Sequence, residues 1–108
     1  MDDFLKLPAE LKTLIKAEEF LYSKHFYQRQ NERNFRSIDV ANSILNGQVI
    51  EHMYSYNRGH KFIIFNTHNE VSFHIVLVYH NNTALLKTIY IPNTEKFLED
   101  LKTRNKQL

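Results

Sequence analysis

The stretch that decides the fold is residues 48–91, QVIEHMYSYNRGHKFIIFNTHNEVSFHIVLVYHNNTALLKTIYI. Polar residues alternate in it with β-branched and aromatic ones, a pattern that is typical of β-strands. We expect four strands, at Gln48–Tyr56, His60–Asn66, Val71–Tyr79 and Ala84–Ile91. The connections between them are only three or four residues long, which is too short for a parallel crossover. The sequence therefore predicts a four-stranded antiparallel meander.

The residues before this stretch predict helices. Pro8 suits a first helical position, and apolar residues at three- and four-residue spacing extend the first helix as far as Leu21. Ser23 is suited to cap a second helix, which runs from Lys24 to about Arg33 and ends near Asn34.

Two further helices complete the expected fold. Ser37 caps a third helix, and Gly47 closes it in a left-handed conformation. Pro92 ends the last strand, and Asn93 or Thr94 caps a short C-terminal helix. The inward residues of that helix are Phe97, Leu98 and Leu101. Helices followed by strands in one small chain indicate an α+β fold, with N-terminal helices packed on one face of the sheet.

The length of 108 residues fits a single domain. We divide it into a helical extension at residues 1–21, a core at 22–97, and the helix end and tail at 98–108. The chain has no cysteine, which excludes a disulfide framework, a thiolate zinc site and a cysteine nucleophile. With only two glycines, it also lacks the glycine-rich phosphate loops of nucleotide-binding proteins.

The sequence shows no membrane span, because no apolar run approaches about 18 residues. The acidic start at Met1–Asp3 does not fit a signal peptide, so we expect a soluble cytoplasmic protein. Neither a metal-binding histidine motif nor a dense carboxylate cluster occurs, and we expect no metal and no cofactor. Residues 1–21 offer a surface for a partner or for oligomer formation.

The third strand divides its residues between two faces of the sheet. One face is apolar and should meet the helices; it holds Val71, Phe73, Ile75, Leu77 and Tyr79. The other face holds Ser72, His74, Val76, Val78 and His80. Thr88 and Tyr90 alternate together on the neighbouring strand, so an imidazole, a hydroxyl and a phenol are expected to converge on one face around His74.

The second helix carries a basic stripe. His25, Arg29 and Arg33 are spaced by four residues, which places them on one helix face. Lys24 and Arg36 lie close to them in the sequence, and aromatic residues interleave with the cations. This mixture is compatible with RNA binding, because cations neutralise phosphates and aromatic rings stack on bases. It is equally compatible with a solvated helix whose arginines pair with Glu32, Asp39 or Glu51.

Six histidines in a chain of this length suggest acid–base chemistry near neutral pH. Two imidazoles on either side of an RNA phosphodiester can remove and supply protons without a metal, since the 2′-hydroxyl is the nucleophile. We expect His74 and His25 to be this pair, in either order. The remaining four, at strand ends and turns, are expected to be solvated: His52, His60, His68 and His80.

Four motifs resemble a known family in the right order. They are YSKHFYQRQNERNFRSIDV at Tyr22–Val40, LNGQVIE at Leu45–Glu51, FHIVLV at Phe73–Val78 and TIYIP at Thr88–Pro92. Together they make residues 22–97 resemble the domain of unknown function 4258 family. Asn34 stands where that family has a glycine, and asparagine also tolerates a left-handed turn.

The resemblance implies a function. The family is similar to the BrnT toxins and is grouped with the small metal-independent ribonucleases of the barnase–EndoU–colicin–RelE class. It therefore implies an RNase-toxin-like domain that cleaves RNA, such as mRNA or tRNA, and that has an antitoxin or immunity protein as partner. The matching positions are His25, Arg29, Arg33, His74, Thr88 and Tyr90.

Each of these residues has an expected role in cleavage. Arg29 holds the scissile phosphate, and Arg33 contacts a flanking phosphate or braces Glu51. Thr88 and Tyr90 donate hydrogen bonds to the phosphate or position a histidine, while Lys24 and Arg36 add to the RNA-binding surface. The alternative is a non-catalytic module of the same fold that binds RNA or a protein, as an accessory or immunity protein would.

Overall fold

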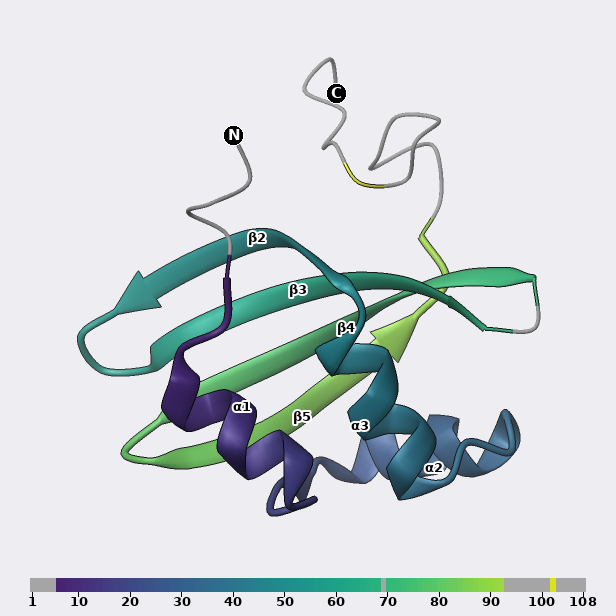
Figure 1. The fold of residues 1–108 in the computed structure, drawn as a ribbon, viewed down its shortest axis with the longest axis horizontal. Helices are drawn as coiled ribbons and strands as arrows, with labels where there is room; N and C mark the ends of the chain where they lie inside the picture. Colours follow the sequence, from purple (N-terminus) through teal and green to yellow (C-terminus); the bar gives the residue numbers. More distant parts are fainter. Residues whose placement is uncertain (1–5, 69, 93–101, 103–108) are drawn as a thin grey trace.

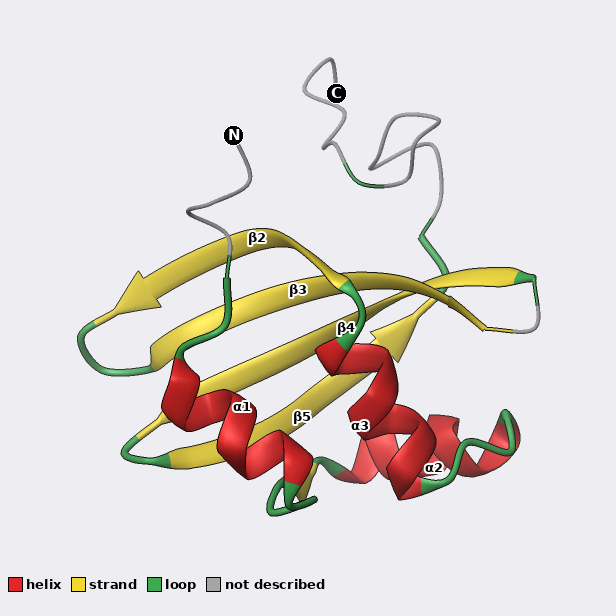
Figure 2. Cartoon of the chain, in the orientation of Figure 1, coloured by secondary structure: helices red, strands yellow, loops and turns green. Residues whose placement is uncertain are grey.

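The computed structural model of the chain describes residues 6–68, 70–92 and 102. Within them the fold is α+β, as expected, with three helices on one face of a five-stranded sheet (Figures 1 and 2). The helices are α1 (Ala9–Lys16), α2 (Lys24–Glu32) and α3 (Ser37–Leu45). The strands are β1 (Leu21–Tyr22), β2 (Gln48–Ser55), β3 (Gly59–His68), β4 (Val71–His80) and β5 (Thr83–Tyr90).

The antiparallel meander is confirmed for β2 to β5, each of which pairs with the next along the chain. His80 pairs with Thr83, so the β4–β5 turn is a two-residue loop. Its residues, Asn81 and Asn82, adopt left-handed φ angles of 50° and 60°, respectively, as such a turn requires. The sheet is nevertheless mixed, with the order β1-β5-β4-β3-β2, since β1 adds a parallel edge beside Leu85 and Leu86 of β5. The expectation of four purely antiparallel strands was wrong in this respect.

The extra strand exists because the first helix is shorter than predicted. α1 ends at Lys16, and Glu18 has a left-handed φ of 57°, which breaks the helix. The chain then becomes extended, and Leu21 pairs with β5 instead of continuing the helix. The predicted helix as far as Leu21 was therefore wrong.

The prediction for α2 is confirmed. The Ser23 side chain accepts a hydrogen bond of 3.0 Å from the backbone N–H of Phe26, which caps the helix. Asn34 follows the helix with a left-handed φ of 57° and turns the chain toward α3.

The ends of α3 differ from the prediction. Its N-cap is Arg36 rather than Ser37, and the Asp39 carboxylate accepts the Arg36 backbone N–H at 3.0 Å. This hydrogen bond, together with the Arg36 guanidinium, lowers the pKa of Asp39. Gly47 is not left-handed; a Cβ there would lie 2.6 Å from both Ile64 Cγ2 and the Ser43 carbonyl oxygen. Glycine is thus required by close packing rather than by φ.

The core lies between the helices and one sheet face, as the alternation predicts. Phe73, Ile75 and Leu77 of β4 are buried in it. Residues from all three helices meet them there, among them Leu11, Ile15, Phe26, Val40 and Ile44. The opposite face of the sheet holds His74. None of the helices in the described part of the chain packs on it, and it is called the helix-free face below. The predicted C-terminal helix with Phe97, Leu98 and Leu101 lies outside the described residues.

Candidate functional site

His74 and Tyr90 form the centre of the candidate site on the helix-free face. They are register partners in β4 and β5, and Nδ1 of His74 lies 3.1 Å from the Tyr90 hydroxyl. Their rings pack edge to face with centroids 5.2 Å apart. His74 is 0% exposed, whereas Tyr90 is half-buried. The predicted convergence of these two side chains is confirmed.

A β-bulge at Lys87 positions Tyr90 for this contact. Leu86 pairs with Leu77 but Thr88 pairs with Val76, so Lys87 is an extra residue in β5. Without the bulge, Thr88 would face the helices, because successive residues of a strand alternate between faces. The bulge brings Thr88 and Tyr90 to the face that holds His74.

The N-terminus of α2 holds the bulge in place. The Ser23 side chain that caps α2 also donates a hydrogen bond to the Lys87 carbonyl oxygen, at 2.5 Å. The Ser23 backbone N–H donates to the Leu86 carbonyl oxygen at 2.9 Å. One serine therefore joins the predicted basic helix to the strand that carries Thr88 and Tyr90.

The exposed residues of the basic stripe remain available to a ligand. Lys24, His25 and Arg29 are exposed on α2, and Arg29 lies 3.9 Å from Glu32. No hydrogen bond, ion pair or ring contact joins His25 to another described residue. The structure therefore brings His74 and Tyr90 together without joining His25 to them.

The other two arginines have different surroundings. Arg36 is exposed and pairs with Asp39 at 3.2 Å. Arg33 is half-buried beside Phe35 and His68, in a cavity of about 220 Å³. Its Nε is buried without a hydrogen-bond partner, and within the described part of the chain no ion pair joins it to Glu51. Of the salt bridges considered from the sequence, the structure contains those to Glu32 and Asp39.

Two histidines expected to be merely solvated form a pair in the middle of the β2–β3 hairpin. Nε2 of His52 lies 2.8 Å from Nδ1 of His60, and the His52 ring stacks on Phe62 with centroids 4.5 Å apart. Partial burial, with a smaller contribution from His60, lowers the pKa of His52. His68 also departs from the expectation, since its ring packs on Phe35. The signal in the sequence was that His52 and His60 are eight residues apart on either side of a short turn, so a hairpin brings them together.

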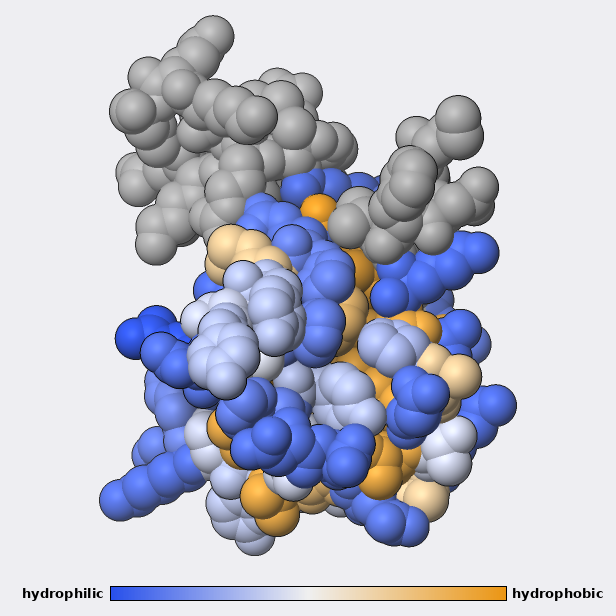
Figure 3. All heavy atoms as spheres, turned by 90° about the vertical axis from the view of Figure 1, so that its left-hand side faces the viewer, coloured by the Kyte–Doolittle hydropathy of each residue, from blue (hydrophilic) through white to orange (hydrophobic). Residues whose placement is uncertain are grey.

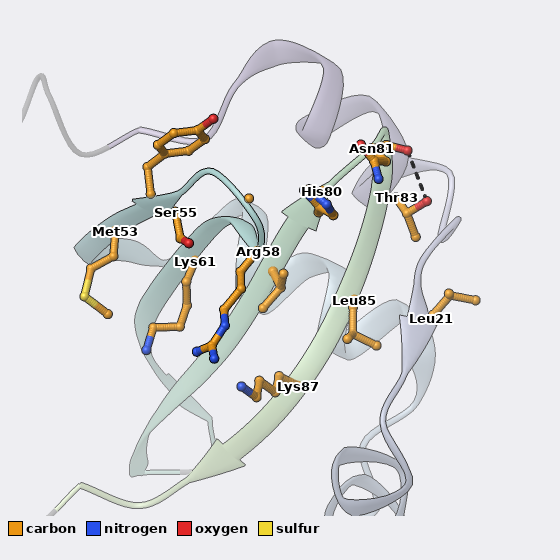
Figure 4. Close-up of a pocket in the computed structure, with 13 residues that line it drawn as sticks. Leu21, Met53, Ser55, Arg58, Lys61, His80, Asn81, Thr83, Leu85 and Lys87 are labelled. Carbon is orange, nitrogen blue, oxygen red and sulfur yellow. Dashed lines mark hydrogen bonds between the residues drawn. The ribbon is translucent and has the colours of Figure 1, made fainter.

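A basic groove, which sequence analysis missed, lies on the helix-free face at the end near the β2–β3 and β4–β5 turns (Figure 4). It has a volume of about 720 Å³, and the basic side chains that line it are Arg58, Lys61, His80 and Lys87. Its non-polar residues include Leu21, Met53, Val78 and Leu85. These residues come from separate parts of the chain, so no local motif announces the groove.

Within residues 6–68, 70–92 and 102, no three His, Asp or Glu side chains cluster as metal ligands would. In the same residues, no helix has the length and apolar character needed to span a membrane. The prediction of a metal-free site thus remains a prediction.

Comparison with known proteins places the chain in a family. Residues 22–91, which are 70 of the 108, match the family described as Domain of unknown function (DUF4258). The chain belongs to this family. No curated protein and no solved structure matches the sequence. The matched segment runs from the second residue of β1 to the residue after β5. It contains His74, Tyr90 and the basic stripe, whereas α1 and Leu21 of the groove precede it.

Proposed function

We propose that this protein is a metal-independent endoribonuclease of the toxin type, related in mechanism to the BrnT and RelE ribonucleases. The observation that carries the proposal is the 3.1 Å contact between His74 Nδ1 and the Tyr90 hydroxyl. A phenol hydrogen-bonded to an imidazole can relay a proton, which is the main requirement for cleaving RNA through its own 2′-hydroxyl. The reaction needs no cofactor.

The proposed reaction begins at Tyr90. Its oxygen accepts the proton of the 2′-hydroxyl while its own proton passes to Nδ1 of His74. The 2′-oxygen then bonds to phosphorus, and the bond from phosphorus to the 5′-oxygen breaks. The leaving 5′-oxygen takes a proton from His25 on α2. The products are a 2′,3′-cyclic phosphate and a 5′-hydroxyl end.

Cations stabilise the negative charge that develops on the phosphorane. We assign this role to Arg29, which is exposed and whose ion pair with Glu32 is long, at 3.9 Å. Thr88 donates a hydrogen bond to the phosphate from the same face as His74. Lys24, Arg33 and Arg36 contact flanking phosphates, and Arg36 must then exchange its contact with Asp39 for the RNA.

The biological setting belongs to the same proposal. A toxin of this type acts on mRNA or tRNA in the cytoplasm, and an antitoxin or immunity protein neutralises it. Residues 1–21 lie outside the family match and are the segment we assign to a partner or to an oligomer contact.

The burial of His74 favours a second function. At 0% exposure, its imidazole does not contact solvent. A fully buried histidine bonded to a tyrosine also serves to stabilise a sheet. On that basis the second candidate is a binding module of the same fold that holds RNA or a protein partner without cleavage, as an accessory or immunity protein does.

A growth experiment separates the two functions. We expect expression of the wild-type chain to arrest growth and to leave RNA fragments with 2′,3′-cyclic phosphate ends. We expect Tyr90→Phe, which keeps the ring and removes the hydroxyl, to relieve the arrest at equal protein level. His74→Ala should relieve it as well, with circular dichroism to confirm that the variant folds. RNA binding without cyclic phosphate ends would instead indicate the binding module.

A further inference from the structure

The basic groove lies on the same sheet face as His74. Met53, Lys61, Val78 and Leu85 are successive register partners across β2, β3, β4 and β5, so they form one row on that face. Phe65, His74 and Tyr90 form a parallel row. Val78 lies four positions after His74 in β4, which corresponds to about 13 Å at the usual rise of a strand. A single extended ligand can therefore contact both rows.

The charges of the groove are of one sign. None of the residues that line it is Asp or Glu. Arg58, Lys61 and Lys87 form no ion pair with any described residue. In Figure 4 the Arg58 side chain reaches between Lys61 and Lys87, and the three cationic ends point into the same space. Like charges at close range repel each other, so this arrangement favours an anion between them.

The groove also has a non-polar surface. Leu21 is 60% exposed and Met53 is 49% exposed, and both line the groove. Figure 3 views this end of the molecule and shows hydrophobic atoms at the surface among hydrophilic ones. A ligand that matches both features has a flat, largely apolar part and an anionic part, as a nucleotide does.

We propose that the basic groove binds the nucleotides of single-stranded RNA that flank the cleaved bond, with phosphates at Arg58, Lys61 and Lys87 and a base against Met53 and Leu85. This inference rests on the proposed function, which supplies RNA as the substrate. It adds a binding site, formed by Leu21 and by parts of residues 53–61 and 78–87, to the residues expected from the sequence. His80 also lines the groove.

Binding of a labelled 2′-O-methyl RNA tests the proposal, because this RNA lacks the 2′-hydroxyl and is not cleaved. The variants are Arg58→Gln, Lys61→Gln and Lys87→Gln. Lys16→Gln, on the exposed side of α1, is the control for loss of one charge. We expect each groove variant to bind about 3- to 10-fold more weakly than Lys16→Gln. The slope of log affinity against log salt should also fall by about 0.7 for each charge removed.

The outcomes separate this inference from the proposed function. If wild-type protein cleaves unmodified RNA but the groove variants bind like Lys16→Gln, the groove assignment is overturned and the ribonuclease stands. If the groove variants lose affinity and wild-type protein does not cleave, the groove assignment stands and the ribonuclease does not. Displacement of the RNA by polyglutamate as readily as by unlabelled RNA would overturn RNA as the occupant.

Discussion

The Tyr90 hydroxyl lies 3.1 Å from Nδ1 of His74 because a bulge at Lys87 turns the end of β5 by one residue. Ala84 and Leu86, the first buried residues after the β4–β5 turn, face the helices. If the alternation continued without a bulge, Tyr90 would face the helices too, and its hydroxyl would lie in the core. The bulge therefore creates the candidate site, and Ser23 holds it through the Lys87 carbonyl oxygen. The central claim is that this pair makes the helix-free face a site for RNA cleavage.

Replacing Ser23 tests how the bulge is held. Ser23→Ala removes both the cap of α2 and the hydrogen bond to Lys87, so we expect the free energy of unfolding to fall by about 1–2 kcal/mol. Chemical denaturation measures this change. Ser55→Ala is the control, because Ser55 is exposed at the end of β2 and forms no hydrogen bond through its side chain in the described part of the chain. Equal stability of the two variants would contradict the role of Ser23.

Gly47 lies where close packing leaves no room for a side chain. A Cβ would lie 2.6 Å from the Ser43 carbonyl oxygen and 2.9 Å from the Phe65 carbonyl oxygen, and backbone atoms do not move aside easily. We expect Gly47→Ala to reduce the free energy of unfolding by about 1–3 kcal/mol. The neighbouring Asn46→Ala, at an exposed position with a φ of −99°, should change it by no more than about 0.5 kcal/mol. A stable Gly47→Ala protein would show that α3 and β3 are not packed this closely.

The His52–His60 pair predicts a dependence of stability on pH. The pKa of His52 is lowered in the folded protein, so the unfolded chain binds more protons between that lowered value and the usual one. Stability from this residue is complete above about pH 6.5 and is lost as the pH falls. We expect the free energy of unfolding to depend less steeply on pH in His52→Gln than in wild type between about pH 5.5 and 7.5. Identical slopes would contradict the assignment.

Arg29 provides a prediction about activity alone. If it stabilises the phosphorane, Arg29→Ala should reduce the cleavage rate by about 10²-fold or more. The exposed ion pair with Glu32 contributes little to stability. The free energy of unfolding of the variant should therefore lie within about 0.5 kcal/mol of the wild-type value. Glu32→Gln removes the partner and keeps the cation, and we expect it to cleave at the wild-type rate. An Arg29→Ala protein that fails to fold would show that the stripe is structural.

Local signals in the sequence predicted most of the fold. Alternation of apolar and polar residues identified β2 to β5, and Ser23 and Asn34 marked the ends of α2. The sequence also predicted that His74, Thr88 and Tyr90 share a face. The spacing of the buried residues in β5 shows why. Ala84 and Leu86 are two positions apart, but Leu86 and Ile89 are three apart, so the alternation between faces shifts by one residue at Lys87.

Features that depend on distant residues were not predicted. β1 has two residues and exists only through pairing with β5, so no periodicity reveals it. Glycine is required at position 47 because Ile64 and Phe65 of β3 pack against it, and these residues are distant in the sequence. The basic groove draws on β1, β2, β3, β4 and β5 and their turns, and only the folded sheet assembles it.

The most direct test of the central claim is the rate at which purified protein cleaves a single-stranded RNA in the presence of a metal chelator. We predict that the wild-type protein cleaves the RNA and leaves 2′,3′-cyclic phosphate ends. We predict that Tyr90→Phe reduces the rate by about 10²-fold or more. Tyr79→Phe, which removes a hydroxyl from the helix-facing side of β4, should retain the wild-type rate. Intact RNA after incubation with folded wild-type protein, or equal cleavage by Tyr90→Phe and wild type, would contradict the claim.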